Sequence, residues 1–407
     1  MIDSGSSVAY SILFLGTLIV LSIVIRSGLK KTGVPSLIGF IALGFLIRLI
    51  DPQGTLISEE TGKIFEFFAE IGVITLLFKV GLESNLKGLV KQLRHASIIW
   101  FGNIIFSGFL GFVIAEYVFH LGLFPSLFIA VALTATSVGV SVNVWHEENA
   151  VKSPTGELLL DVAEMDDISG IMFLALILSI IPVLKGNLDV SLADAVGKTI
   201  GILLLKLFAF GLVCTLFSRY VEPHITSFFS KIRHSPDPML IMAGFGFIIA
   251  ALAGVLGFSL ALGAFFAGLV FSRDPKAVKL DASFGALYDL FTPFFFIGIG
   301  LKIEPSSLNS AVGLGVVLTI VAVIGKLIGN GLPSLFFMGW TSVLLLSVSM
   351  VPRAEIAMIV MQRGRDLGDW AVPDHVFGAM VVVSLATCIF SSLALKRMLK
   401  RWPQRSD

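Results

Sequence analysis

Two adjacent carboxyl groups, Asp166 and Asp167, lie in the middle of a long apolar stretch of the chain. Charged side chains are costly in hydrocarbon, and the few that occur there usually carry function. Successive residues of a helix point about 100° apart, so both aspartates can face one cavity without sharing a proton. Burial favours the protonated form of a carboxyl group, and a nearby like charge favours it further. The pair is therefore predicted to bind protons and a hard monovalent cation in competition, and a structural pair near the membrane interface is the alternative.

Hydroxyl groups and a proline mark two other apolar stretches. Thr136 and Ser137 lie in the middle of one of them, where their hydroxyls and a nearby glycine allow a helix to break. Pro352 lies in the other and interrupts the helix because it lacks a backbone donor. Half-helix ends inside a membrane can bind ions, so the site is predicted between the two breaks, with Thr136 and Ser137 as ligands. Arg353 and Glu355, beside the second break, are predicted to compensate the exposed helix ends.

A lysine, Lys326, lies in the middle of a further apolar stretch. A buried ammonium group requires a carboxylate partner or must lose its charge, and Asp166 is the predicted partner. An ion pair that breaks when Asp166 takes up a proton or a cation would make Lys326 a second proton carrier, and a fixed structural bridge is the alternative. Glu164, three residues before Asp167 on a nearby helix face, is predicted to add a carboxylate to the cavity or to line its entrance.

The elements that must position these residues are membrane-spanning helices. The 407 residues are 56% hydrophobic and only 14% charged, too few charges to cover the surface of a water-soluble chain. Lipid permits only helices or closed barrels, and the apolar runs do not alternate as barrel strands do. About thirteen spans are predicted, near residues 8–26, 35–49, 64–81, 96–118, 123–143, 156–183, 197–218, 237–256, 258–272, 285–303, 311–330, 339–361 and 376–395.

The spans contain an inverted repeat. Segment 39–44 (GFIALG) resembles segment 263–268 (GAFFAG), and segment 81–83 (GLE) resembles segment 300–302 (GLK). Each pair lies seven predicted spans apart, and an odd number inverts one copy relative to the other in the membrane. Inverted repeats with interrupted helices are a recurrent construction of secondary transporters. The predicted fold class is an all-α polytopic membrane protein with two discontinuous crossing helices.

Charge in the connections predicts orientation and partners. Lysine and arginine gather on one side of the predicted topology, in segments 30–31, 87–94, 231–233, 273–279 and 396–405. The side rich in lysine and arginine is normally cytoplasmic, which predicts an amino terminus outside and a carboxyl terminus in the cytoplasm. The net charge of +1 gives no indication of a nucleic-acid partner, and the apolar composition makes membrane lipid the predicted partner. No cofactor is predicted, and the sequence contains no Walker A motif for ATP hydrolysis.

Four motifs taken together are similar to those of the monovalent cation:proton antiporter superfamily, in the branch of bacterial sodium/proton antiporters and potassium-efflux transporters. They are 134–139 (TATSVG), 166–170 (DDISG), 294–301 (FFFIGIGL) and 352–355 (PRAE). The resemblance implies one transmembrane unit over residues 1–407, with interleaved dimerisation and core domains. It also implies a homodimer in a bacterial inner membrane, with a core that moves like an elevator.

The resemblance assigns roles to individual residues. It implies that Asp167 is the obligate carrier of ion and proton, with Na⁺ bound at Asp167 and Asp166. Two aspartates together with Lys326 are typical of electrogenic members. The chain departs from the usual pattern at Glu164 and Met165, which leaves the choice of cation and the proton count open.

The chain ends soon after the last span, without the nucleotide-binding regulatory domain of many potassium-efflux relatives, which favours a plain antiporter or a truncated chain.

Other functions remain open as alternatives. Potassium/proton exchange uses the same architecture, and Li⁺ is a further candidate cation. Sodium-coupled symport of an organic anion occurs on related folds, although Lys326 and the paired acids favour protons. An intramembrane aspartyl protease requires two aspartates on different helices that share a proton, which Asp166 and Asp167 do not supply. A channel is disfavoured because interrupted inverted helices around titratable acids suit alternating access.

Overall fold

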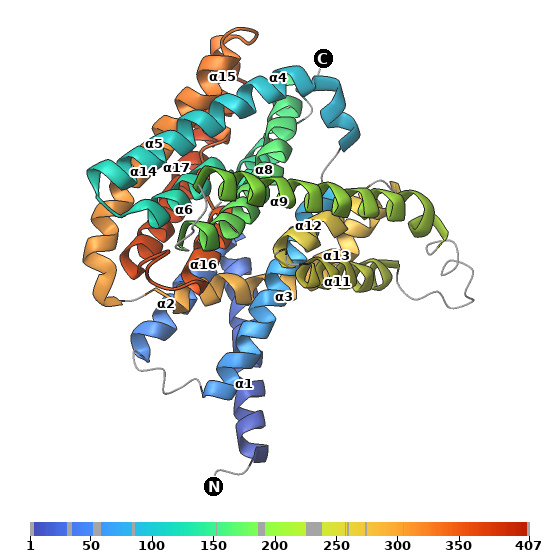
Figure 1. Ribbon diagram of the computed structural model, residues 1–407, viewed down its shortest axis with the longest axis vertical. Helices are drawn as coiled ribbons and strands as arrows, with labels where there is room; N and C mark the ends of the chain where they lie inside the picture. The colour runs from blue at the N-terminus through green and yellow to red at the C-terminus, as the bar shows by residue number, and fades with distance from the viewer. Residues whose placement is uncertain are drawn as a thin grey trace. The chain divides into compact units, whose positions relative to one another are not determined.

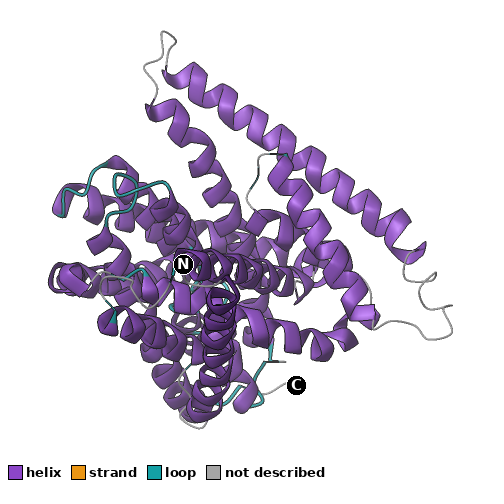
Figure 2. Cartoon of the chain, turned by 90° about the horizontal axis from the view of Figure 1, so that it is seen from below, coloured by secondary structure: helices purple, strands orange, loops and turns teal. Residues whose placement is uncertain are grey.

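The computed structural model consists of helices and their connections, and the part of the chain that it describes contains no strand (Figures 1 and 2). It describes residues 4–30, 35–51, 58–83, 86–151, 153–185, 192–224, 238–256, 258, 260–272, 275–303 and 305–404. The predicted all-α fold class is confirmed. The elements are α1 (Ser4–Lys30), α2 (Ser36–Ile50), α3 (Glu59–Glu83), α4 (Leu86–Asn103), η1 (Ile104–Gly108), α5 (Phe109–Val113), η2 (Ile114–Val118), α6 (Leu123–Thr134), α7 (Val138–Glu147), α8 (Pro154–Lys185), α9 (Leu192–Leu216), η3 (Phe217–Val221), α11 (Pro238–Val255), α12 (Leu260–Phe271), α13 (Pro275–Leu301), η4 (Pro305–Ser307), α14 (Leu308–Ser334), α15 (Trp340–Ser349), α16 (Glu355–Asp366) and α17 (Asp374–Arg401).

Every predicted membrane span contains a helix. Within the described residues, seven helices are long and apolar enough to cross a bilayer, and five shorter apolar helices accompany them. The third predicted span is α3, which runs without interruption from Glu59 to Glu83. The total of thirteen membrane spans stays a prediction.

The chain divides into two compact units, each assembled from three separate segments. Unit 1 comprises Met1–Val20, Ile57–Asn85 and Leu174–Phe296, and unit 2 comprises Leu21–Leu56, Leu86–Phe173 and Ile297–Asp407. In unit 1, α12 packs against both α3 and α11. In unit 2, α14 packs along α4 and α17, which Figure 1 shows beside it.

The repeated glycines of the sequence lie at two helix crossings of the same kind. In unit 1, a Cβ atom on Gly81 of α3 would lie 2.1 Å from a backbone oxygen of α12, and one on Gly268 of α12 would lie 2.2 Å from a backbone oxygen of α3. In unit 2, a Cβ atom on Gly44 of α2 would lie 2.0 Å from a backbone oxygen of α13, and one on Gly300 of α13 would lie 2.1 Å from a backbone oxygen of α2. Only glycine permits such close backbone contacts. The α2–α13 crossing thus reproduces the α12–α3 crossing, as an internal repeat requires.

Two helices of unit 2 are interrupted where the sequence predicts. The first break separates α6, which ends at Thr134, from α7, which begins at Val138. The second separates α15, which ends at Ser349, from α16, which begins at Glu355. Both predicted discontinuous helices are therefore present.

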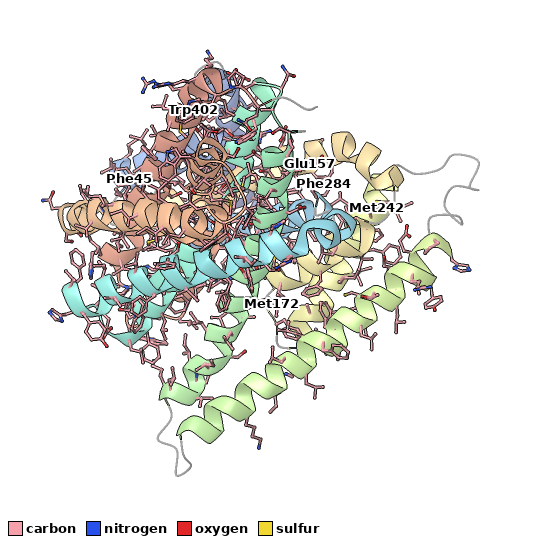
Figure 3. The ribbon with its side chains drawn as sticks, turned by 90° about the horizontal axis from the view of Figure 1, so that it is seen from above. Phe45, Glu157, Met172, Met242, Phe284 and Trp402 are labelled. Atoms are coloured by element: carbon pink, nitrogen blue, oxygen red, sulfur yellow. The ribbon has the colours of Figure 1, made fainter. Side chains whose placement is uncertain are left out.

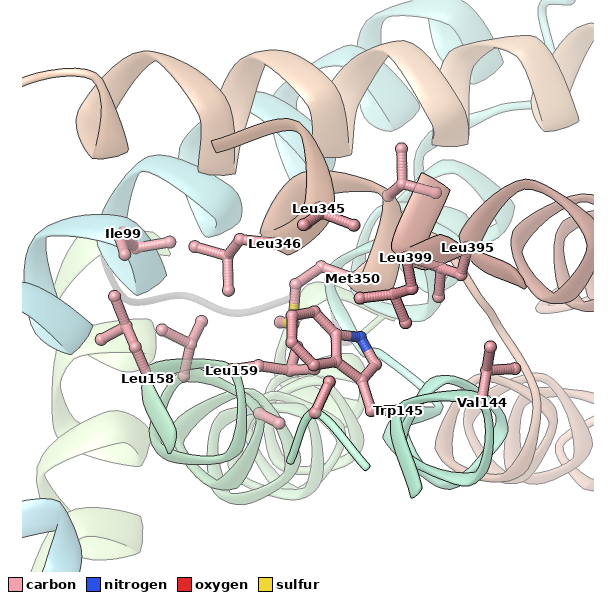
Figure 4. Close-up of a cluster of buried hydrophobic side chains, with 14 of the residues drawn as sticks. Ile99, Val144, Trp145, Leu158, Leu159, Leu345, Leu346, Met350, Leu395 and Leu399 are labelled. Atoms are coloured by element: carbon pink, nitrogen blue, oxygen red, sulfur yellow. The ribbon is translucent and has the colours of Figure 1, made fainter. Parts of the chain in front are cut away.

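A large apolar cluster of unit 2 packs against one of these breaks (Figure 4). Trp145 of α7 is fully buried within it, and its indole N–H donates to Ser349 Oγ over 2.8 Å. Met350, the first residue of the second break, is also part of the cluster. Packing therefore fixes the place at which α15 ends. The buried members are Ala96, Ile99, Val144, Trp145, Ala150, Leu158, Leu159, Val162, Ala163, Leu345, Leu346, Val348, Met350, Leu395 and Leu399.

In unit 1, α9 exposes apolar side chains along its length (Figure 3). Leu205, Phe208 and Val213 each expose more than half of their surface. A water-soluble surface rarely carries such a continuous apolar face, whereas a helix that contacts lipid requires one.

Candidate functional site

The two helix breaks of unit 2 contact each other through their backbones. The N–H of Ser137 in the first break donates to the carbonyl oxygen of Pro352 in the second over 2.9 Å. The guanidinium of Arg353 donates in the opposite direction, from Nη1 to the carbonyl oxygen of Ala135 over 2.6 Å. Helix ends leave backbone groups without intrahelical partners, and a buried end must find them elsewhere. Arg353 is fully buried and supplies one of these partners, and its role in compensating the helix ends stays a prediction.

Asp166 of α8 lies beside this crossing and is only 1% exposed. Its Oδ2 atom accepts hydrogen bonds from Thr136 Oγ1 at 2.6 Å and from Lys326 Nζ at 2.8 Å. The Nδ2 group of Asn103 lies 2.7 Å from Oδ1 and 2.8 Å from Oδ2. The expected ion pair between Lys326 and Asp166 is therefore present in the structure.

The environment of Lys326 explains how a fully buried ammonium group is tolerated. Its Nζ atom donates to Asp166 Oδ2 at 2.8 Å, to Thr136 Oγ1 at 2.5 Å and to the carbonyl oxygen of Thr134 at 2.9 Å. An ammonium group has three donors, so all of them are satisfied. The carbonyl of Thr134 is available because α6 ends there and no following turn uses it. The broken helix thus supplies an acceptor that a continuous helix would not offer.

The other predicted site residues lie around this ion pair. Asp167 is partly buried and close enough to Lys326 to interact with it electrostatically. The hydroxyl of Ser137 donates to the carboxylate of Glu355 at the start of α16, so these two form a separate pair. Glu164 belongs to α8, but its side chain lies outside the described residues. The structure brings Thr136, Asp166 and Lys326 into direct contact.

Asn103 is a site residue that sequence reasoning missed. It is fully buried at the end of α4, and its side-chain oxygen accepts a hydrogen bond from Ser107 Oγ at 3.0 Å. An uncharged amide in an apolar run gives little indication of function. The available signal is a repeated pattern, because segment 102–107 (GNIIFS) recurs as segment 329–334 (GNGLPS) in α14.

The site has the chemistry required for exchange of a cation. The hydroxyl of Thr136 accepts from Lys326 and donates to Asp166, so it links the two charges. The ammonium group is held by a carboxylate oxygen, a hydroxyl oxygen and a carbonyl oxygen, and hard cations prefer oxygen ligands of these kinds. Interrupted helices that meet at such a site within an inverted repeat define the class of secondary transporters.

Comparison with known proteins identifies the family. The family model described as sodium/hydrogen exchanger, transmembrane, matches residues 16–401. The chain belongs to this family, and it is a membrane-embedded cation/proton antiporter rather than an enzyme. The predicted superfamily is thereby confirmed.

Two curated relatives and one solved structure are similar over most of their length. The chain is 29% identical over 374 residues to a Na⁺/H⁺ antiporter of Enterococcus hirae, covering 91% of this chain and 94% of the relative. It is 29% identical over 338 residues to the high-affinity Na⁺/H⁺ antiporter NhaS3 of Synechocystis sp., covering 81% of this chain and 70% of the relative. Its fold matches the sodium proton antiporter MjNhaP1 of Methanocaldococcus jannaschii at pH 8, with a TM-score of 0.74, 16% identity and 97% of each chain covered.

Proposed function

We propose that this chain moves Na⁺ and protons in opposite directions across a bacterial inner membrane, with Asp166 and Asp167 binding either a cation or protons. The observation that supports this most strongly is the buried Lys326–Asp166 pair at the open end of α6. A monovalent cation that displaces the ammonium group would meet oxygens of Asp166, Thr136 and Thr134, which already surround a positive charge. The names of both curated relatives support Na⁺ as the cation.

The same geometry supports electrogenic exchange. In the proposed cycle, a cation that takes the place of the Lys326 ammonium group causes Lys326 to release its proton, because a buried ammonium without a carboxylate is unfavourable. Asp167 releases a second proton when it becomes a ligand. Two protons then leave for one Na⁺ that enters, and one net charge crosses the membrane in each cycle.

The division of the chain into two units supports an elevator-type movement. Unit 2 contains both interrupted helices and all described residues in contact with Asp166, so we assign it as the mobile core domain. Unit 1 is assigned as the dimerisation domain of a homodimer. The amino terminus is assigned to the outside and the carboxyl terminus to the cytoplasm, following the distribution of lysine and arginine.

The experiment is a flux assay in proteoliposomes with an imposed pH gradient. Dissipation of the gradient is followed as Na⁺, Li⁺ or K⁺ is added, with Asp167→Asn as the comparison. We expect flux with Na⁺ or Li⁺ that depends on membrane potential and disappears in Asp167→Asn. Flux in the variant equal to that of the wild type would overturn the site, and a preference for K⁺ would make the protein a potassium/proton antiporter. If no cation supports flux between pH 6 and 9, symport of an organic anion becomes the next hypothesis to test.

A further inference from the structure

Asn103 has a distinctive position in the site. It is the last residue of α4, directly before the π-helical turn η1, and such turns often occur at functional sites. Its Nδ2 group lies within hydrogen-bond distance of both carboxylate oxygens of Asp166, at 2.7 and 2.8 Å, and 3.3 Å from the carbonyl oxygen of Thr134. The amide therefore lies across the carboxylate rather than against one oxygen.

The orientation of this amide is held from the other side. Ser107, one turn further along, donates its hydroxyl proton to Asn103 Oδ1 over 3.0 Å. A flipped amide would present its oxygen to the carboxylate of Asp166 and lose both interactions. Ser107 thus keeps the donor end of Asn103 directed at Asp166.

The inverted repeat contains a second copy of the same motif. Gly102 and Gly329 lie where α4 and α14 cross, because a Cβ atom on Gly102 would be 2.5 Å from the carbonyl oxygen of Gly329. Asn330 of α14 is as fully buried as Asn103. Its Nδ2 group, however, donates to the backbone oxygen of Lys326 over 3.0 Å and to no carboxylate. The two asparagines share sequence context and burial, and they differ in the group that they bind.

We propose that Asn103 is a positioning residue that holds the carboxylate of Asp166 in the orientation in which it binds a cation, and thereby sets the affinity of the site for Na⁺. Charged groups also lie near Asp166: Lys326 from α14 binds it, Arg353 from the second break interacts with it electrostatically, and Asp167 from its own helix interacts with Lys326. Glu355 is bound to Ser137 at the same crossing. Asn103 differs from all of these because it is neutral, so it continues to donate when Lys326 leaves and a cation arrives. This inference rests on the proposed exchange at Asp166.

The consequence for transport has a definite sign. The amide of Asn103 lies across both oxygens of Asp166 and fixes the orientation of the carboxylate. Without Asn103, the site is expected to bind Na⁺ less tightly. Loss of one hydrogen bond to a charged group corresponds to about a tenfold change in affinity. The KM for Na⁺ should therefore rise about tenfold, whereas kcat should change little.

The test compares Asn103→Ala with its matched control Asn330→Ala in proteoliposomes. We expect the KM for Na⁺ to rise about tenfold in Asn103→Ala, with little change in kcat, and to stay unchanged in Asn330→Ala. An unchanged KM in Asn103→Ala, or equal changes in both variants, would overturn the proposal.

A second variant covers the case in which Asn103→Ala does not fold. Ser107→Ala removes the group that orients the amide and leaves Asn103 in place, so a smaller rise in the KM for Na⁺ is expected, and an unchanged KM counts against the proposal. Thermal stabilisation by Na⁺, measured in detergent at several Na⁺ concentrations, gives the same comparison without transport. If the wild type shows no cation-dependent flux, the proposed function fails. Weaker stabilisation by Na⁺ confined to Asn103→Ala would still support the role of Asn103, and its absence would refute it.

Discussion

Replacing Lys326 by methionine tests how strongly the buried ion pair holds the crossing together. Methionine keeps an unbranched side chain but removes the hydrogen bonds to Asp166, Thr136 and the carbonyl of Thr134. Removal of one partner of a buried pair costs about 3–5 kcal/mol, because the other charge stays buried without its ion-pair partner. With an unfolding entropy of about 2 cal/mol/K per residue, the midpoint for a chain of 407 residues falls by about 1.2 °C for each kcal/mol of lost stability. We therefore expect the midpoint of thermal unfolding to fall by about 4–6 °C.

The control is an ion pair on the surface of the same unit. Lys302 lies 3.4 Å from Asp366, with 38% and 40% of the two side chains exposed. Exposed pairs contribute about 0–1 kcal/mol, so Lys302→Met is expected to lower the midpoint by about 1 °C at most. Buried and exposed lysines should therefore differ clearly in the same assay.

A double-mutant cycle isolates the interaction of Lys326 with Asp166. The variant Lys326→Met, Asp166→Leu replaces the pair by apolar side chains, which is often neutral or stabilising. We expect the double variant to regain more than half of the loss seen in Lys326→Met. The measurement is thermal unfolding of purified protein in detergent, followed by intrinsic fluorescence at one scan rate because membrane proteins often unfold irreversibly. Additive effects of the two substitutions would refute the reasoning, because they would show that the charges do not stabilise each other.

Two other substitutions test the crossing and the site separately. Gly300→Ala places a Cβ atom 2.1 Å from a backbone oxygen of α2, so the midpoint of thermal unfolding is expected to fall by several °C. The control is Gly285→Ala in the same helix, whose Cβ atom meets no atom within 4 Å and should leave the midpoint unchanged. Thr136→Val keeps the shape of the side chain but removes the hydroxyl between Lys326 and Asp166, so the KM for Na⁺ should rise about tenfold, corresponding to one hydrogen bond to a charged group. A KM unchanged in titrations of proteoliposome flux with Na⁺ would contradict the role of that hydroxyl.

The sequence predicts the features of this fold that hydrocarbon makes costly. Charged residues in apolar runs stand out, so the sequence predicts Asp166, Lys326 and Arg353 as site residues and predicts the ion pair between Lys326 and Asp166. Helix breaks stand out for the same reason, since Pro352 removes a donor in a place without water. The first break comprises residues 135–137 and lies within the segment whose hydroxyls predict it.

Contacts between distant neutral groups could not be predicted. Asn103 lies 63 residues from Asp166 in sequence, and nothing in an apolar run indicates the direction in which an amide points. Ser137 was predicted as an ion ligand, whereas its hydroxyl donates to Glu355, 218 residues away. Short polar side chains next to each other in a helix break point in different directions. Thr136 therefore binds Asp166, whereas Ser137 binds Glu355. Only the packing of the helices determines these partners.

The charge balance at the crossing explains how this site could couple protons to a cation. Among the described side chains, Lys326 and Arg353 bring two positive charges, and Asp166, Asp167 and Glu355 bring three carboxyl groups. One additional positive charge, from a proton or from a monovalent cation, makes the group neutral, and an uncompensated buried charge is unfavourable by several kcal/mol. The proposed electrogenic cycle requires more, because release of the Lys326 proton leaves the cation-loaded group with one net negative charge.

Arg353 has the means to stabilise that extra charge. Its Nη1 atom binds the carbonyl of Ala135, whereas Nε and Nη2 are buried and have no hydrogen-bond partner among the described residues. A guanidinium remains charged at any pH at which the protein functions. It interacts electrostatically with Asp166, so a carboxylate that loses Lys326 keeps a permanent cation nearby. The residue predicted to compensate a broken helix is therefore also placed to stabilise the carboxylate of Asp166 when Lys326 loses its charge.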